Sequence, residues 1–171
     1  TAGYRTGLYS SPHLHRVEER FVVDGEPIAS EVLCEIIERV RPIAEELDRR
    51  ATEPDDAGLT FFDITTAIAL VHFAQQGCQA VVLEVGLGGR LDSTNVCLPT
   101  VSVITSISFD HTRQLGNTLA SIASEKAGII KPGVPVVSAR QLPEAERVIR
   151  ETCEQKGCAL SFADDVTVVD A

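Results

Sequence analysis

One stretch of the sequence, residues 80–95, constrains most of what the rest of the chain can form. It begins with an apolar run, Ala80-Val81-Val82-Leu83, and then breaks into a glycine-rich loop, Gly86-Leu87-Gly88-Gly89. This pattern is typical of a buried parallel strand whose C-terminal end opens into a ligand crevice. We therefore predict a parallel α/β sheet with a functional site beside this loop.

Glu84 is the residue of this stretch that does not suit a buried strand. A carboxylate inside an apolar run must be paired, protonated or bound to a cation, because burying a lone charge is costly. The residues alone leave a metal ligand and a structural salt bridge as open alternatives. A dinucleotide-binding loop is not indicated, because Leu91 stands where that pattern requires glycine or alanine.

Strand and helix patterns alternate along the chain. Helices are predicted at residues 30–50, 61–76 and 143–156, and from Asn117 or Thr118 to Ala127. Strands are predicted at residues 5–9, 100–107, 134–138, 159–162 and 166–169, around Glu84, and in a hairpin at 19–28 with an Asp24-Gly25 turn. This alternation predicts a doubly wound, mostly parallel sheet flanked by helices.

Two of the predicted helices differ in character. The first is amphipathic, with Ser30 expected as its N-cap, so it should cover the sheet from outside. The second, capped by Thr60, is apolar nearly all round and should be buried between layers. Its polar residues Asp63 and His72 are interpreted as satisfied groups in a packed helix, because buried polar groups usually have partners.

Other polar residues have ordinary interpretations when taken alone. His13 and His15 lie in a Ser-Pro loop and are expected to be solvated. His111 follows the strand at 100–107, at the end where open α/β sheets carry their chemistry. Lys126, near the C-terminus of its helix, is favoured there by the helix dipole.

Composition excludes several classes of function. A net charge of −10 argues against a nucleic-acid surface, and the lack of an apolar run near eighteen residues argues against a membrane span. The five cysteines include no C-x-x-C pair and indicate a reduced, cytoplasmic protein. The chain has no Met and no signal-peptide pattern, so we expect a piece of a longer protein.

A phosphate-binding loop of the G-x-x-x-x-G-K-[ST] type is absent from the sequence. Gly128 and Gly133 have its glycine spacing, but Val134 stands where the lysine is needed. No Ser/His/Asp or Cys/His nucleophile set has recognisable spacing either.

Several motifs spread over nearly the whole chain resemble one enzyme family. They are Gly7 to Leu14, Glu19-Arg20-Phe21, Thr60-Phe61-Phe62-Asp63, Leu83 to Asn95, Asp110-His111-Thr112 and Ser124 to Ile129. Together they resemble folylpolyglutamate synthase/dihydrofolate synthase, a branch of the Mur ligase superfamily. Ser11-Pro12-His13-Leu14 favours the folate branch over cell-wall ligases, while Asp63 departs from the glutamate usual in the family.

The resemblance implies an ATP-dependent ligase that adds L-glutamate to dihydropteroate, to folate polyglutamates or to both, through an acyl phosphate. Residues 1–171 would then form part of one central ATP-binding domain. The family's phosphate loop and C-terminal domain would lie outside it, so the fragment alone should be inactive. The full-length enzyme is expected to be a cytoplasmic monomer that binds neither nucleic acid nor membrane.

The resemblance also implies roles for particular residues. Glu84 and His111 match Mg²⁺ ligands, and His111 and Lys126 are the implied catalytic residues. Lys126 matches a lysine that is carbamylated in this superfamily and helps to bind a second Mg²⁺; only a deprotonated amine forms a carbamate, and burial favours that form. Ser11 is implied near the metal, and His13 and Phe61 near the pterin pocket, as the ATP- and substrate-binding set.

Two alternatives remain at this level. The first is a related Mur-type or cyanophycin-type amide ligase, and the second is a non-catalytic scaffold domain. The set of Glu84, His111 and Lys126 argues against a scaffold, because a buried carboxylate and a buried amine are costly without a partner.

Overall fold

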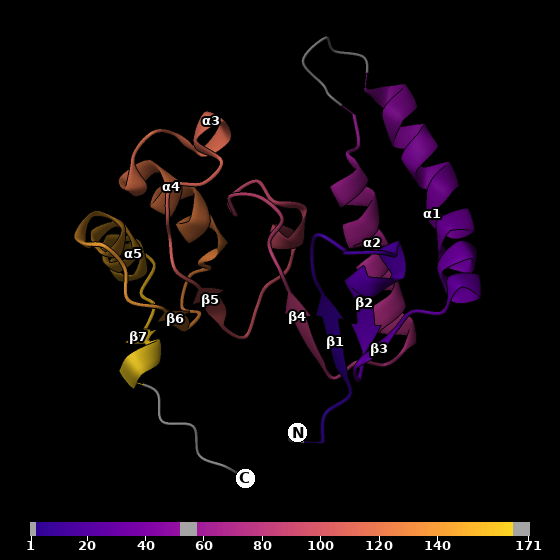
Figure 1. Cartoon of the computed structure of the whole chain (residues 1–171), viewed down its shortest axis with the longest axis horizontal. Coiled ribbons are helices and arrows are strands. Elements are labelled where there is room, and N and C mark those ends of the chain that lie inside the picture. The colour runs from indigo at the N-terminus through magenta and orange to yellow at the C-terminus, as the bar shows by residue number, and fades with distance from the viewer. Residues whose placement is uncertain (1–2, 52–57, 166–171) are drawn as a thin grey trace. The chain divides into compact units, whose positions relative to one another are not determined.

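The computed structural model describes residues 3–51 and 58–165, and Figure 1 shows the chain. The chain divides into two compact units, Thr1–Gly86 and Leu87–Ala171. Each unit has a sheet and a hydrophobic core of its own. The predicted α/β class, with parallel strands flanked by helices, is confirmed. The strand predicted at 166–169 lies outside the described residues.

The first unit is built on a sheet with the strand order β3-β2-β1-β4. Its strands are β1 (Thr6–Tyr9), β2 (Phe21–Val23), β3 (Glu26–Pro27) and β4 (Ala80–Leu83), with the 3-10 turn η1 (Val17–Arg20) before β2. β1 and β4 are parallel neighbours with Tyr9 opposite Leu83, and the other pairs are antiparallel. The hairpin turn at Asp24 and Gly25 is confirmed, since both have the positive φ that such a turn needs.

Two helices cover this sheet, α1 (Ser30–Arg50) and α2 (Phe61–Gln75), and they lie side by side in Figure 1. Thr60 caps α2 as predicted, in a reciprocal pair with Asp63. Ser30 is not the cap of α1, because Ala29 holds that position and the Ser30 hydroxyl bonds to Glu18 instead. The core of the unit contains the fully buried rings of Tyr9 and Phe21.

The second unit has a parallel sheet with the order β5-β6-β7. Its elements are η2 (Ser93–Val96), β5 (Ser102–Ile104), α3 (Thr112–Leu115), α4 (Leu119–Lys126), η3 (Ala127–Ile129), β6 (Val136–Ser138), α5 (Pro143–Gln155), β7 (Leu160–Phe162) and η4 (Ala163–Asp165). The short helix α3 was not expected from the sequence. The core packs α4 and α5 against the sheet around Ile122, Ile130 and Ile149.

The prediction that the strands at 80–85 and 100–107 are buried is wrong for much of their length. Val82 in β4 is 56% exposed and Val103 in β5 is 57% exposed. Within the described part of the chain, β4 pairs only with β1 and β5 only with β6. Each therefore lies at the end of its sheet among the residues that the structure describes.

His72 in α2 is buried but not satisfied, so that part of the prediction is also wrong. Its side chain is packed in the first unit, and its Nδ1 atom has no hydrogen-bond partner among the described residues. Burial lowers the pKa of His72, and the nearby charge of Arg5 adds to this effect. Both effects favour the neutral form of the ring.

No helix within residues 3–51 and 58–165 combines the length and apolar character needed to cross a membrane.

Candidate active site

The loop that follows β1 contacts the residue that follows β4, at the carboxyl ends of these two parallel strands. Because these strands are parallel and in register, the residues that follow them come together. The backbone N–H of Glu84 donates to the Tyr9 carbonyl at 3.0 Å, and the backbone N–H of Ser11 donates to Glu84 Oε2 at 2.7 Å. The predicted residues Ser11 and Glu84 are therefore in direct contact.

Glu84 is not buried inside the strand, contrary to the prediction. β4 ends at Leu83, so Glu84 is the first residue beyond it and is exposed. Its Oε1 atom accepts no hydrogen bond from the described residues, which leaves an oxygen of the type that Mg²⁺ prefers. The carboxylate oxygens of Glu84 fit such a cation. Because Glu84 is exposed, burial of its charge does not support a cation site.

The loop that carries His13 is shaped by the carboxylate of Glu19. This carboxylate accepts backbone N–H bonds from Leu14 at 2.8 Å, His15 at 3.1 Å and Arg16 at 2.9 Å. The bonds from Leu14 and then Arg16 lower the pKa of Glu19. Residues 13–16 are thus tied to the η1 turn.

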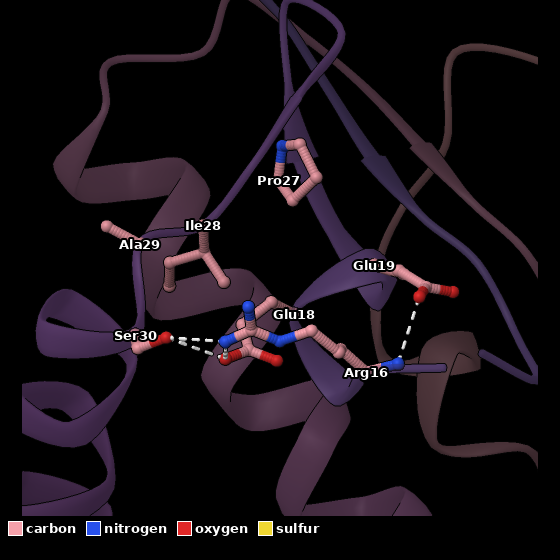
Figure 2. A pocket seen from close by; sticks show the side chains of 7 residues that line it. All are labelled: Arg16, Glu18, Glu19, Pro27, Ile28, Ala29 and Ser30. Carbon is pink, nitrogen blue, oxygen red and sulfur yellow. Dashed lines mark hydrogen bonds and ion pairs between the residues drawn. The ribbon is translucent and has the colours of Figure 1, made fainter. Parts of the chain in front are cut away.

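A shallow pocket lies on the same turn, and Figure 2 shows its lining. Arg16 Nη2 donates to Glu18 Oε1 at 2.7 Å and to Ser30 Oγ at 2.9 Å, and Ser30 Oγ donates to Glu18 Oε1 at 2.8 Å. The Glu18 backbone N–H, Ser30 and Arg16 lower the pKa of Glu18 to about 2. These groups satisfy one another, and no predicted site residue lines the pocket, so we interpret it as structural.

His13 and Phe61 are connected through a residue that the sequence analysis did not single out, Arg20. Arg20 Nε donates to His13 Nδ1 at 2.8 Å, and its guanidinium carbon lies 5.4 Å from the centre of the Phe61 ring. His15 is exposed as expected, but His13 is half-buried, so the prediction of a solvated loop histidine is wrong for His13. The place of Arg20 in the Glu19-Arg20-Phe21 motif is the signal that could have identified it.

In the second unit, the glycine loop is fastened to the end of α4. The backbone N–H of Arg90 donates to the Glu125 carbonyl at 2.9 Å, and the Arg90 guanidinium donates to Glu125 Oε1 at 2.9 Å. Asn95 Nδ2 donates to the Gly128 carbonyl at 3.3 Å. Arg90 and Asn95 therefore support the loop, and Lys126 is the last residue of the helix to which it is fastened.

Asp92 shapes the loop from within. Its Oδ2 atom accepts the N–H of Leu87 at 3.0 Å, and its Oδ1 atom accepts the N–H of Thr94 at 2.9 Å. These bonds fold the segment between the glycines and η2 back on itself.

His111 and Lys126 are the predicted site residues of the second unit. His111 is exposed with a left-handed backbone, and its Nε2 atom lies 3.5 Å from Asp110 Oδ2. Burial was expected to favour carbamylation of Lys126. Lys126 is the last residue of α4 and is only half-buried. Among the described residues, no cluster of three or more His, Cys, Asp or Glu side chains could hold a metal ion, so Mg²⁺ binding stays a prediction.

The Mur ligase middle domain family matches residues 45–167. The chain belongs to this family. Among Mur ligase relatives, the "Dihydrofolate synthase/folylpolyglutamate synthase" of Bacillus subtilis is 43% identical over 169 residues, which are 98% of this chain. The predicted resemblance to that branch is confirmed. The chain spans 38% of the length of this relative.

Solved Mur ligase structures agree with the fold. A folylpolyglutamate synthase of Mycobacterium tuberculosis, complexed with ADP and AMPPCP, matches 94% of this chain with a TM-score of 0.87 and 34% identity, over 37% of its own length. A structure titled as an FPGS-AMPPCP-folate complex matches 94% of the chain with a TM-score of 0.86 and 39% identity, over 38% of its own length.

Proposed function

We propose that the whole protein is an ATP-dependent ligase that adds L-glutamate to dihydropteroate, to folate polyglutamates or to both. The observation that carries this proposal is the 43% identity to a dihydrofolate synthase/folylpolyglutamate synthase across 98% of the chain. The similarity to a structure whose title names a nucleotide analogue and folate gives further support.

The proposed reaction has two steps. The acceptor carboxylate takes the γ-phosphoryl group of ATP, giving an acyl phosphate and ADP. The amino group of glutamate then attacks the acyl carbon, an amide bond forms and inorganic phosphate leaves. Such chemistry depends on positioning and charge neutralisation more than on covalent catalysis by the protein.

The residues of this chain have distinct proposed tasks. Glu84 and His111 act as Mg²⁺ ligands, and Lys126 acts after carbamylation as an anionic ligand. Bound Mg²⁺ would neutralise charge on the nucleotide phosphates. Glu84 is supported by its bond from Ser11 and by its Oε1, which accepts no hydrogen bond from the residues that the structure describes, while imidazole is a less usual Mg²⁺ ligand. Ser11 holds the loop near the metal, and His13 and Phe61 contact the acceptor.

We also propose that all 171 residues belong to a single central ATP-binding domain. The family match at residues 45–167 runs across the boundary between the two compact units, which supports this proposal. The full-length protein is proposed to be a cytoplasmic monomer. The net charge of −10 on the 171 residues of this chain disfavours nucleic acid and anionic membranes as partners.

The proposal is tested by glutamate-dependent ADP release from the protein extended to its native termini. Parallel reactions contain dihydropteroate or a reduced folate as acceptor. Release with one acceptor identifies a synthase or a polyglutamylase, and release with both identifies a bifunctional enzyme. A folded protein that binds Mg-ATP but releases no ADP with either acceptor would contradict the proposal.

Lys126 is tested in the same assay by Lys126→Ala. Loss of turnover is expected, while Ser124→Ala, an exposed position on the same helix, should keep wild-type turnover. Unchanged turnover in Lys126→Ala would rule out the proposed role of this residue.

A further inference from the structure

Arg20 is a buried cation with an unusual set of contacts. Arg20 is the last residue of η1 and is only 7% exposed. Among the described residues it has no carboxylate partner; its side chain contacts the ring of Phe61 and donates to His13. Because a buried charge without a counter-charge is costly, filling space is a poor explanation for an arginine here.

The bond to His13 fixes the chemistry of the imidazole ring. A guanidinium group has only donors, so His13 Nδ1 must be the acceptor in this 2.8 Å contact. A ring that accepts at Nδ1 cannot carry a proton there, and its proton is therefore on Nε2. His13 thus presents an N–H donor on the side of the ring away from Arg20.

The neighbouring groups hold this arrangement in place. The Glu19 carboxylate ties the N–H groups of Leu14, His15 and Arg16, so the loop after His13 is anchored. Phe61, the first residue of α2, is 60% exposed although its ring lies against the guanidinium. An exposed aromatic ring beside a fixed N–H donor suits a planar ligand that carries hydrogen-bond acceptors.

We propose that Arg20 is a positioning residue for the acceptor substrate: it fixes the Nε2–H tautomer of His13 and supports the ring of Phe61. His13 then donates to a carbonyl or ring nitrogen of a planar acceptor group that lies against Phe61. This inference rests on the proposed ligase function, and it assigns Arg20 a task at the acceptor end of that reaction.

The tautomer is tested first, by ¹⁵N NMR of histidine-labelled protein at a pH where histidine is neutral. The His13 signals are assigned by their loss in His13→Gln. In the wild type, Nδ1 should resonate as an unprotonated nitrogen and Nε2 as a protonated one. In Arg20→Met, which keeps the apolar stem and removes the donors, the signals should move toward a tautomer mixture. Unchanged His13 signals would overturn the proposed contact.

The role in binding is tested by steady-state kinetics of the full-length enzyme. Arg20→Met should raise the KM for the acceptor on the order of tenfold, the scale of one lost charge-assisted hydrogen bond. The KM for ATP should stay unchanged. His13→Gln should behave in the same way, and the double variant should be no worse than either single variant. Additive losses, or an equal rise in the KM for ATP, would overturn the positioning role.

Matched variants separate positioning from folding. Arg16→Gln removes a guanidinium from the same turn that contacts Glu18 and Ser30, so it should leave both the His13 spectrum and the acceptor KM unchanged. Arg20→Lys keeps a donor and should recover part of the acceptor affinity. If Arg20→Met does not fold, Arg20→Lys and His13→Gln still decide the question.

Failure of the proposed function has a different signature. A folded wild-type enzyme that releases no ADP with either acceptor would overturn the ligase proposal and the kinetic role of Arg20 with it. A His13 spectrum that changes in Arg20→Met would still support the Arg20–His13 contact in that case.

Discussion

Glu84 and Ser11 are joined across the ends of two parallel strands, because the backbone N–H of Ser11 donates to Glu84 Oε2 at 2.7 Å. The backbone N–H of Glu84 is itself held by the Tyr9 carbonyl. Main-chain groups therefore orient the carboxylate. Because it is already held in place, it would lose little conformational entropy on binding a ligand. This relationship gives Glu84 a fixed direction even though the residue is exposed.

Glu84→Gln is expected to remove activity without disturbing the fold. The amide oxygen can still accept the Ser11 N–H, so the midpoint of thermal unfolding should not change. The charge that would attract Mg²⁺ is lost, and kcat should fall by about 100-fold or more. ADP release measured against Mg²⁺ concentration checks this. Glu26→Gln, at an exposed position of β3, serves as the control, and a wild-type Mg²⁺ response in Glu84→Gln would contradict the assignment.

Glu19→Gln is expected to loosen the loop at residues 13–16. It should also make the free energy of unfolding less dependent on pH in the acid range. The pKa of Glu19 is lowered in the folded state, so the unfolded state binds the proton at higher pH. The contribution of Glu19 is thus complete above the ordinary carboxyl pKa of 4.5 and is lost as the pH falls through the lowered value. Urea unfolding at a series of acid pH values measures the slope. Glu35→Gln, exposed on α1, should keep the wild-type slope.

His72 gives a second pH dependence at higher pH. Burial lowers its folded-state pKa from 6.5, so the unfolded state binds a proton more readily. The contribution of neutral His72 to the free energy of unfolding should be fully present above about pH 6.5 and should be lost as the pH falls through the folded-state pKa. His72→Leu removes the ring whose Nδ1 has no partner among the described residues, and it should weaken this dependence. Urea unfolding between neutral and mildly acid pH tests this, with the exposed His15→Gln as control; an unchanged slope in His72→Leu would contradict it.

The parts of the fold that depend on local sequence could be predicted. The periodicity of residues 30–50 reproduces the bounds of α1, and the Asp24-Gly25 pair gave the hairpin turn. The Thr60 cap was also found, because its partner Asp63 lies only three residues away. These features are set by neighbours in the chain, which a single sequence displays directly.

The parts that depend on distant residues could not be predicted. An apolar run does not show which edge of a strand is paired, so the exposure of Val82 was missed. The contact between Arg20 and Phe61 joins segments far apart in sequence, so the residues around either one do not predict it. The site residues themselves came from motif resemblance, and the structure added the bonds that orient Glu84 and His13.

Gly128→Ala is expected to disturb the fastening of the glycine loop. A Cβ at Gly128 would collide with Arg90 Cα and lie 2.8 Å from Arg90 N, and these backbone atoms cannot move aside as the end of a flexible side chain can. Relief requires the loop and the end of α4 to separate, which weakens the bond from the Arg90 N–H to the Glu125 carbonyl. Overpacking of this kind costs about 1–3 kcal/mol. Urea unfolding should show this loss, while Ser124→Ala on the exposed side of α4 should show none. Because the same movement displaces Lys126, activity should fall further than stability alone explains; wild-type stability in Gly128→Ala would mean that the loop is not held against the helix as described.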